Sequence, residues 1–188
     1  MFFDYYSQEL KETLDQISRE DIEKLEGCIQ EARENGKHVF VLGNGGSAAA
    51  ASHWVCDFGK GINVGNSRRL KIFAPSDHSS IYTAYGNDNS YNETMSEQLK
   101  NFLEPGDLVI SLSVSGSSGN LVEAHKLAAE VGAKTICIVG DYNGKLIGMS
   151  DLPIVIKSKN YGVVEDIHII LEHAISQDVK RAIAAQMG

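Results

Sequence analysis

Five short apolar runs, separated by stretches long enough for helices, constrain the fold of this chain more than any other feature. Each run is rich in Val, Ile or Leu and lacks the polar alternation that marks a strand with one solvated face. Strands that are covered on both faces and joined by helical crossovers are typical of parallel sheets. We therefore predict an α/β fold with a five-stranded parallel sheet flanked by helices, with strands at residues 38–42, 70–74, 108–112, 135–139 and 153–156.

Amphipathic patterns lie at both ends of the chain. In residues 5–35 apolar side chains recur every three or four positions, which predicts two helices. Ser18 or Asp21 is expected to start the second helix, and Gly36 to follow its end. Residues 163–187 are predicted to form one long amphipathic helix.

Length and composition favour one compact domain. The chain has 188 residues, of which 43% are hydrophobic, enough for one sizeable core. We expect a single domain, 1–188, in which a helical hairpin (1–35) precedes an α/β core (36–188) that ends in the long helix.

Charge and cysteine content argue against several classes of partner. Asp and Glu number 25 against 17 Lys and Arg, so the formal charge of -8 offers no broad basic field for nucleic acid or an anionic membrane. An anionic ligand must then be held by local donors. The three cysteines form neither a disulfide framework nor a zinc finger, and no export signal or run of about 18 apolar residues is present, which favours the cytoplasm.

Two turns that follow predicted strands have the chemistry of anion sites. Residues 43–47 read Gly-Asn-Gly-Gly-Ser and lead into four alanines, a strong helix start. Residues 113–120 read Ser-Val-Ser-Gly-Ser-Ser-Gly-Asn and also lead into a helix. Small residues bring backbone N–H groups and hydroxyls close to a ligand, and the positive ends of the helices face the same place. Each turn alone is equally typical of a simple helix cap, but two in one sheet favour a phosphorylated small molecule.

Nucleotide motifs fit this sequence poorly. Gly43, Gly45 and Ala48 loosely match the dinucleotide pattern, but no acidic residue follows at the distance that would hold a ribose. The Walker pattern also fails, because Leu146 follows Lys145 where Ser or Thr is required.

Four side chains on two predicted helices have acid/base or metal-binding chemistry. His53 and Asp57 are spaced i, i+4 and share a helix face. Glu165 and His173 lie about 80° apart around the last helix, so both can border one pocket. Two imidazoles and two carboxylates can ligate a divalent metal or transfer protons, although each residue alone is more typical of a solvated face or a satisfied core histidine. That ordinary interpretation is kept for five further residues: His38, His78, His125, His168 and Glu172.

Together these motifs resemble those of SIS-domain sugar-phosphate isomerases, and best those of the phosphoheptose isomerases. The resemblance rests on the 43–47 turn, the histidine six residues after Ser47, the serines of the second turn, and His168 and His173, and it covers nearly the whole chain. It implies a flavodoxin-like SIS domain with an N-terminal helical extension and homotetramers with active sites between subunits. It also implies interconversion of sedoheptulose 7-phosphate and D-glycero-D-manno-heptose 7-phosphate, and a site for zinc.

The resemblance assigns the catalytic and metal roles by position. The family's base falls on Asp57 and its acid on His173, and the metal set on His53, Asp57, Glu165 and His173. Two positions depart from the family, which has Glu where Asp57 stands and Gln where Glu165 stands. The shorter aspartate shifts the base by roughly 1 Å, and the extra carboxylate favours a divalent cation.

The remaining assignments concern the substrate. Ser113, Ser115 and Ser118 are expected to hold the phosphate, and Asn44, Ser47 and Asp77 to contact sugar hydroxyls. The second turn, residues 113–120, contains Val114 where the family has threonine. This difference removes a hydroxyl but no backbone donor. The other expected binding residues are Gly45, Gly46 and Lys60, the last near the place of a family arginine.

Two other functions stay open at this point. Some relatives keep the fold but act as protein-binding factors in replication initiation, without isomerase chemistry. A third interpretation is an isomerase or a regulatory sensor for another sugar phosphate, such as an amino sugar. The departures at Asp57 and Glu165 are compatible with these alternatives, but both residues retain ionisable oxygens.

Overall fold

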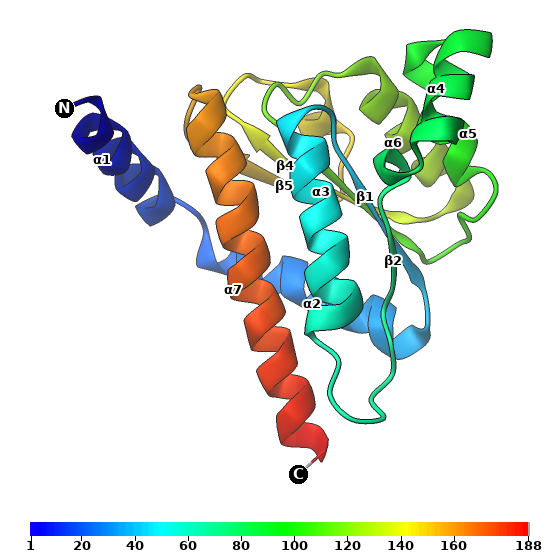
Figure 1. The fold of residues 1–188 in the computed structure, drawn as a ribbon, viewed down its shortest axis with the longest axis horizontal. Helices are drawn as coiled ribbons and strands as arrows, with labels where there is room; N and C mark the ends of the chain where they lie inside the picture. Colours follow the sequence, from blue (N-terminus) through cyan, green and yellow to red (C-terminus); the bar gives the residue numbers. More distant parts are fainter. Residues whose placement is uncertain (188) are drawn as a thin grey trace.

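The computed structural model describes residues 1–187 and contains one five-stranded sheet in which all neighbouring strands are parallel (Figure 1). The strand order is β2-β1-β3-β4-β5, the flavodoxin-like order that the resemblance implies. Each of the five predicted apolar runs forms a strand, within one residue of the expected ends. The strands are β1 (His38–Leu42), β2 (Lys71–Phe73), β3 (Leu108–Ser113), β4 (Lys134–Gly140) and β5 (Leu152–Ile156).

Helices cover both faces of the sheet, which explains why the strand sequences do not alternate. Val39 and Val41 of β1 pack into the cluster that contains residues of α2, α3 and α7. Phe40 and Leu42 face the opposite cluster, to which α5 and α6 contribute. These helices are α2 (Arg19–Asn35), α3 (Gly46–Cys56), α5 (Ser96–Leu99), α6 (Gly119–Val131) and α7 (Tyr161–Met187). The remaining elements are α1 (Phe2–Asp15), α4 (Ser79–Asp88), η1 (Asp57–Gly61), η2 (Pro75–Asp77), η3 (Tyr91–Glu93) and η4 (Lys145–Gly148).

The N-terminal helices form as predicted but do not pack as a hairpin. Ser18 is the N-cap of α2, where its Oγ accepts from the Asp21 N–H at 3.2 Å, and Gly36 ends the helix at φ 67°. α1 projects from the body and contacts α7, whereas α2 packs between α7 and the sheet (Figure 1). α2 thus buries its apolar face against other elements, whereas α1 packs only partly, through Tyr6, Leu10 and Leu14, and leaves Phe2, Phe3 and Tyr5 exposed.

The packing of α3 against α7 matters most for function. Trp54 of α3 is completely buried, and its Nε1–H donates to the backbone carbonyl of His168 in α7 at 3.1 Å. This contact positions the helix that carries His53 against the helix that carries His173. None of the helices in residues 1–187 combines the length and hydrophobicity that a membrane crossing requires. All three cysteines are free thiols.

Candidate active site

The two predicted anion turns meet at the carboxyl end of the sheet. β1 and β3 are neighbours, and the chain leaves β1 toward β2 on one side and β3 toward β4 on the other. Such a switch point is where ligands bind in open α/β sheets. The turns after these strands border one cavity of about 130 Å³, which Glu165 of α7 also lines. Five predicted binding residues therefore come together around it: Asn44, Ser47, Ser113, Ser115 and Ser118.

The glycine turn has the close backbone approach that its sequence suggests. Gly45 has φ 54°, a conformation that L side chains rarely adopt. A Cβ on Gly43 would overlap the backbone carbonyl of Ser47, and a Cβ on Gly46 would overlap the carboxylate of Glu165. The absence of side chains here therefore lets α3 begin directly against β1 and lets Glu165 approach the turn.

The serine turn is organised by its own hydroxyl groups. Ser113 is buried, and its Oγ accepts from the Gly116 N–H at 3.0 Å, while Ser115 Oγ accepts from the Ser117 N–H at 3.3 Å. Ser118 is the N-cap residue of α6, although its side chain makes no capping bond. The hydroxyl protons of Ser113 and Ser115 are left to donate to a ligand, next to the positive end of α6.

Asn44 is held by a polar network that the sequence did not reveal. Its Oδ1 accepts from Asn120 Nδ2 at 2.9 Å, Tyr91 Oη at 2.9 Å and Tyr82 Oη at 3.1 Å, and its Nδ2 donates to Asn120 Oδ1 at 2.9 Å. Burial, followed by the hydrogen bond with Tyr82, raises the pKa of Tyr91 to about 12. The network fixes the Asn44 amide at the cavity edge. Tyr82 and Tyr91 come from α4 and η3, elements with no recognisable motif, whereas Asn120 ends the 113–120 motif at the start of α6.

A second cluster of functional groups lies where α3 meets α7. The Nε2 atoms of His53 and His173 are 3.0 Å apart, and His53 Nε2 is 3.8 Å from Asp57 Oδ2. Glu172 Oε2 is 3.6 Å from His53 Nε2 and 3.4 Å from His173 Nε2. One ligand atom from each of these four residues lies within 4.8 Å of all the others. The proposed base and acid, Asp57 and His173, are thus brought together within one subunit.

Asp57 occupies an unusual backbone position in this cluster. It begins η1, a π-helical turn closed by the Ile62 N–H, which donates to the Asp57 carbonyl at 3.0 Å. Single π turns occur frequently at functional sites. The turn follows α3 directly, so the i, i+4 spacing keeps His53 and Asp57 on one face, as predicted.

Glu172 is the residue that sequence reasoning missed. It was expected on a solvated helix face, but its side chain is fully buried and neither carboxylate oxygen has a hydrogen-bond partner among the described residues. Burial, and secondarily the nearby charge of Asp57, raises the pKa of Glu172 to about 8. Glu165, the carboxylate that the resemblance assigned to the metal, lies instead at the turn cavity, where Ser47 Oγ donates to its Oε1 at 3.5 Å.

The other predicted residues are more peripheral. Asp77 is exposed on η2 and accepts a hydrogen bond from Ser52 of α3, and Lys60 is exposed on η1. His125 and His168 are satisfied core histidines, as expected: their Nε2 atoms contact Ser111 Oγ at 2.8 Å and the Ile138 carbonyl at 3.0 Å. Burial lowers the pKa of both imidazoles to about 4. His38 contacts Asp107 at 3.4 Å, and His78 is exposed.

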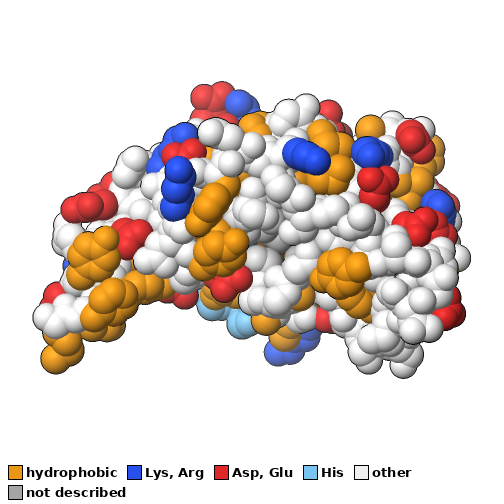
Figure 2. Space-filling model, turned by 90° about the horizontal axis from the view of Figure 1, so that it is seen from above, with side chains coloured by type: hydrophobic (Ala, Val, Ile, Leu, Met, Phe, Trp, Pro, Cys, Tyr) orange, Lys and Arg blue, Asp and Glu red, His pale blue; other side chains and the backbone are white. Residues whose placement is uncertain are grey.

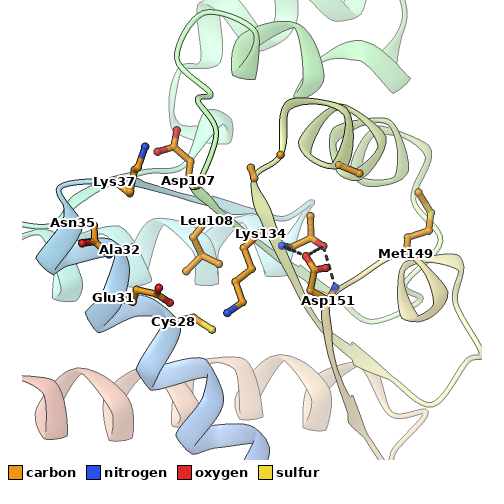
Figure 3. A pocket seen from close by; sticks show the side chains of 15 residues that line it. Cys28, Glu31, Ala32, Asn35, Lys37, Asp107, Leu108, Lys134, Met149 and Asp151 are labelled. Carbon is orange, nitrogen blue, oxygen red and sulfur yellow. Dashed lines mark hydrogen bonds between the residues drawn. The ribbon is translucent and has the colours of Figure 1, made fainter.

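A larger cavity, about 680 Å³, lies at the opposite, amino ends of the strands (Figure 3). Two of its carboxylates are engaged in holding strand starts. Asp107 accepts from the N–H groups of His38 and Glu104, each at 2.8 Å, and Asp151 accepts from the Thr135 N–H at 2.8 Å. These two carboxylates therefore have structural roles, and the other titratable side chains that line the cavity are Cys28, Glu31, Lys37 and Lys134.

The cluster of two imidazoles and two carboxylates is a suitable donor set for a divalent metal. Imidazole nitrogen and carboxylate oxygen are ordinary ligands of Zn²⁺ and related cations. A buried carboxylate without a partner is costly, and a cation between the four side chains would offset that cost. The chemistry of the residues therefore fits the metal that the resemblance implies.

Comparison with known proteins places the chain in a family. The SIS domain profile matches residues 2–140. The phosphoheptose isomerase of Aliarcobacter butzleri is 35% identical over 159 residues, covering 85% of this chain and 84% of that protein. The phosphoheptose isomerase of Synechocystis sp. is 32% identical over 179 residues, covering 95% and 92%. A phosphoheptose isomerase structure from Neisseria gonorrhoeae aligns with a TM-score of 0.86 at 25% identity, covering 96% of this chain and 97% of that one. The chain therefore belongs to the SIS-domain phosphoheptose isomerases, a family of enzymes.

Proposed function

We propose that this protein is an aldose-ketose isomerase that converts sedoheptulose 7-phosphate to D-glycero-D-manno-heptose 7-phosphate. The observation that carries the proposal is the placement of two complementary sites along one pair of helices. Ser47 at the phosphate-type cavity and His53 at the acid/base cluster are six residues apart on α3, about 9 Å along its axis. A sugar phosphate whose phosphate lies at the serine turn can therefore extend its carbonyl end toward Asp57 and His173.

The phosphate end is held without basic side chains. The hydroxyls of Ser113, Ser115 and Ser118 and the N-terminus of α6 supply donors on one side of the cavity. The N–H groups of Gly45 and Gly46 supply donors from the turn before α3. Binding energy at this remote group orients the reacting carbons.

The hydroxyls along the carbon chain would meet polar groups between the two sites. Asn44 and Ser47 line the cavity, and Asp77 approaches α3 through its hydrogen bond with Ser52. Lys60 is exposed on η1, so it would contact the substrate only from the solvent side of the cluster that contains His53 and Asp57.

The chemical step is a proton transfer between two neighbouring carbons. Asp57 removes the proton from C1 of the ketose, which leaves an enediolate, and returns a proton to C2. His173 donates a proton to the oxygen on C2 and accepts one from the oxygen on C1, so the carbonyl moves from C2 to C1 and no atoms are gained or lost overall. His173 would also assist opening of the sugar ring by moving protons between its oxygens.

A divalent metal, zinc as the resemblance implies, would be held by His53, Asp57 and His173 together with a fourth carboxylate. When bound, it supplies electrophilic stabilisation of the negative charge that develops on the substrate oxygens. The protein contributes the orientation of these side chains, through the i, i+4 spacing on α3 and the Trp54 contact with α7.

We further propose cytoplasmic homotetramers with active sites between subunits, and one domain spanning 1–188. α1 extends from the body, and large apolar side chains at its N-terminal end are more than half exposed (Figure 2): Met1, which precedes the helix, and Phe2, Phe3 and Tyr5. Exposed apolar patches mark interaction surfaces, and in the proposed tetramer a second copy of the chain would cover this one.

Proton NMR of sedoheptulose 7-phosphate incubated with the protein in heavy water tests the reaction. We expect an aldose product with deuterium at C2, faster in the presence of zinc, and we expect an Asp57→Asn variant to lose the product. Glu123→Gln, a change at a partly exposed carboxylate of α6 outside the site, serves as the matched control. Binding of the sugar phosphate without turnover or deuterium uptake would reject the isomerase and favour the sensor or the protein-binding factor.

A further inference from the structure

One acidic side chain of the α3–α7 cluster has no role in the catalytic assignments above. Glu172 is fully buried, yet both of its oxygens lack hydrogen-bond partners among the described residues. Its Oε2 lies 3.6 Å from His53 Nε2 and 3.4 Å from His173 Nε2. A buried carboxylate is normally paired or coordinates a metal, so this geometry calls for a cation.

Glu165 does not satisfy the same requirement. It precedes Glu172 by seven residues, which places both on nearly the same stripe of α7 but about 10 Å apart along the helix axis. Its carboxylate lies against Gly46, so closely that a Cβ there would overlap it, and accepts from Ser47 Oγ. Glu165 thus belongs to the turn cavity, two helical turns away from the imidazoles.

We propose that Glu172, rather than Glu165, is the fourth protein ligand of the divalent metal, together with His53, Asp57 and His173. The inference deepens the proposed function and rests on it, because the metal is the one implied for that reaction. The resemblance suggests Glu165 as this ligand. The proposal replaces it with Glu172, which lies two helical turns further along α7.

Exposure of the four side chains agrees with this role. His53 and His173 are 43% and 45% exposed, whereas Glu172 has no exposed surface. The carboxylate therefore closes the protein side of the site, and the imidazoles leave the solvent side open to substrate. Two carboxylates and two neutral imidazoles also balance the charge of a divalent cation, so the ion can be bound at a partly buried position without a net charge.

Metal binding by the full-length apoprotein, prepared by chelation, tests the assignment without measuring activity. Zn²⁺ and Co²⁺ are titrated into wild type, Glu172→Gln and Glu165→Gln, with calorimetry for affinity and stoichiometry and visible absorption for the Co²⁺ coordination sphere. The two variants are matched, since each replaces one carboxylate by its amide on the same helix. Loss of an outer-shell partner alone typically costs 10- to 100-fold in affinity, so we expect Glu172→Gln to weaken binding by about a hundredfold or more.

We expect Glu165→Gln to leave the affinity within about threefold of wild type and the Co²⁺ spectrum unchanged, and Glu172→Gln to change the spectrum. A Glu172→Met variant, which fills the buried site without an unpaired polar atom, should show the same loss and guards against misfolding of the amide variant. Because the family has Gln where Glu165 stands, Glu165→Gln keeps a ligand atom at that position; Glu165→Met removes it and should also leave the affinity and the Co²⁺ spectrum unchanged. The reverse pattern, with loss in Glu165→Met and not in Glu172→Met, would overturn the assignment while leaving the isomerase proposal intact. Absence of metal binding in wild type would overturn it too, and deuterium uptake at C2 would still decide the reaction independently.

Discussion

A double-mutant cycle between Gly46 and Glu165 tests whether the Glu165 side chain lies against the glycine turn, residues 43–47. Gly46 is the first residue of α3, and its φ is not positive, so alanine suits its backbone and would otherwise favour the helix by about 0.5–1 kcal/mol. The new Cβ, however, would overlap the Glu165 carboxylate. Overpacking of this kind costs about 1–3 kcal/mol, so we expect a cost of about 2 kcal/mol for this clash.

The net expectation for Gly46→Ala is therefore a loss of about 1 kcal/mol, which corresponds to a fall in melting temperature of about 2–4 °C for a chain of this size. In a Glu165→Ala background the clash is gone, and the same substitution should stabilise by about 0.5–1 kcal/mol. The coupling free energy between the two sites is then about 2 kcal/mol, within the range measured for residues in contact.

Urea denaturation of the four proteins at one fixed protein concentration measures this coupling, because oligomerisation makes stability depend on concentration. Gly45→Ala provides the control: its backbone, at φ 54° and ψ -123°, strains an alanine by about 1–3 kcal/mol, but no atom beyond its immediate chain neighbours lies within 4 Å of the added Cβ. Its cost should be the same with and without Glu165. If Gly46→Ala costs equally in both backgrounds, Glu165 does not lie against the turn, and the separation of the two carboxylates on α7 is refuted.

Three further outcomes are expected. Burial holds the His168 pKa at about 4 in the folded protein, against about 6.5 when unfolded, so the unfolded chain binds more protons between these values and stability falls as the pH drops from 6.5 to 4. The loss is about 2 kcal/mol at pH 5, and a His168→Gln variant should show a flatter dependence of the urea midpoint on pH; an unchanged slope would contradict the neutral buried imidazole. Asn120→Ala leaves the Asn44 amide without its partner and should cost about 1–3 kcal/mol in urea denaturation, whereas an effect below experimental error would show that the network is not stabilising. Asp57→Asn should reduce kcat for the sugar phosphate by about 10²–10⁴-fold, and wild-type turnover would remove Asp57 as the base.

The fold was largely predictable because the relevant information is local. Val- and Ile-rich runs of strand length and helix-length spacers determine a parallel sheet, and the structure has strands at all five runs. Ser18 and Gly36 were recognisable as helix ends because caps depend on side chains and backbone conformations at single positions. The packing of α1 was not predictable, since an amphipathic pattern gives the apolar face of a helix but not the element that covers it.

The candidate site was predictable only where one turn or one helix carries it. The turns after β1 and β3 were found as motifs, and their meeting follows from the strand order. The tyrosines that hold Asn44 come from α4 and η3, so no spacing in the sequence connects them with it. Long-range contacts of this kind depend on how several elements pack together.

Glu172 shows how a functional residue can be hidden by the usual interpretation of a helix pattern. A glutamate in an amphipathic helix is normally solvated, but Glu172 lies four residues after the buried His168 and stands between Leu171 and Ile175, both nearly inaccessible. The sequence therefore contained a signal, because an ionisable side chain stood at a position of the helix that the apolar pattern assigns to the core. Such a conflict between burial and polarity costs stability and is expected mainly at functional sites. The identity of its partners became apparent only with the docking of α3, through Trp54, beside α7.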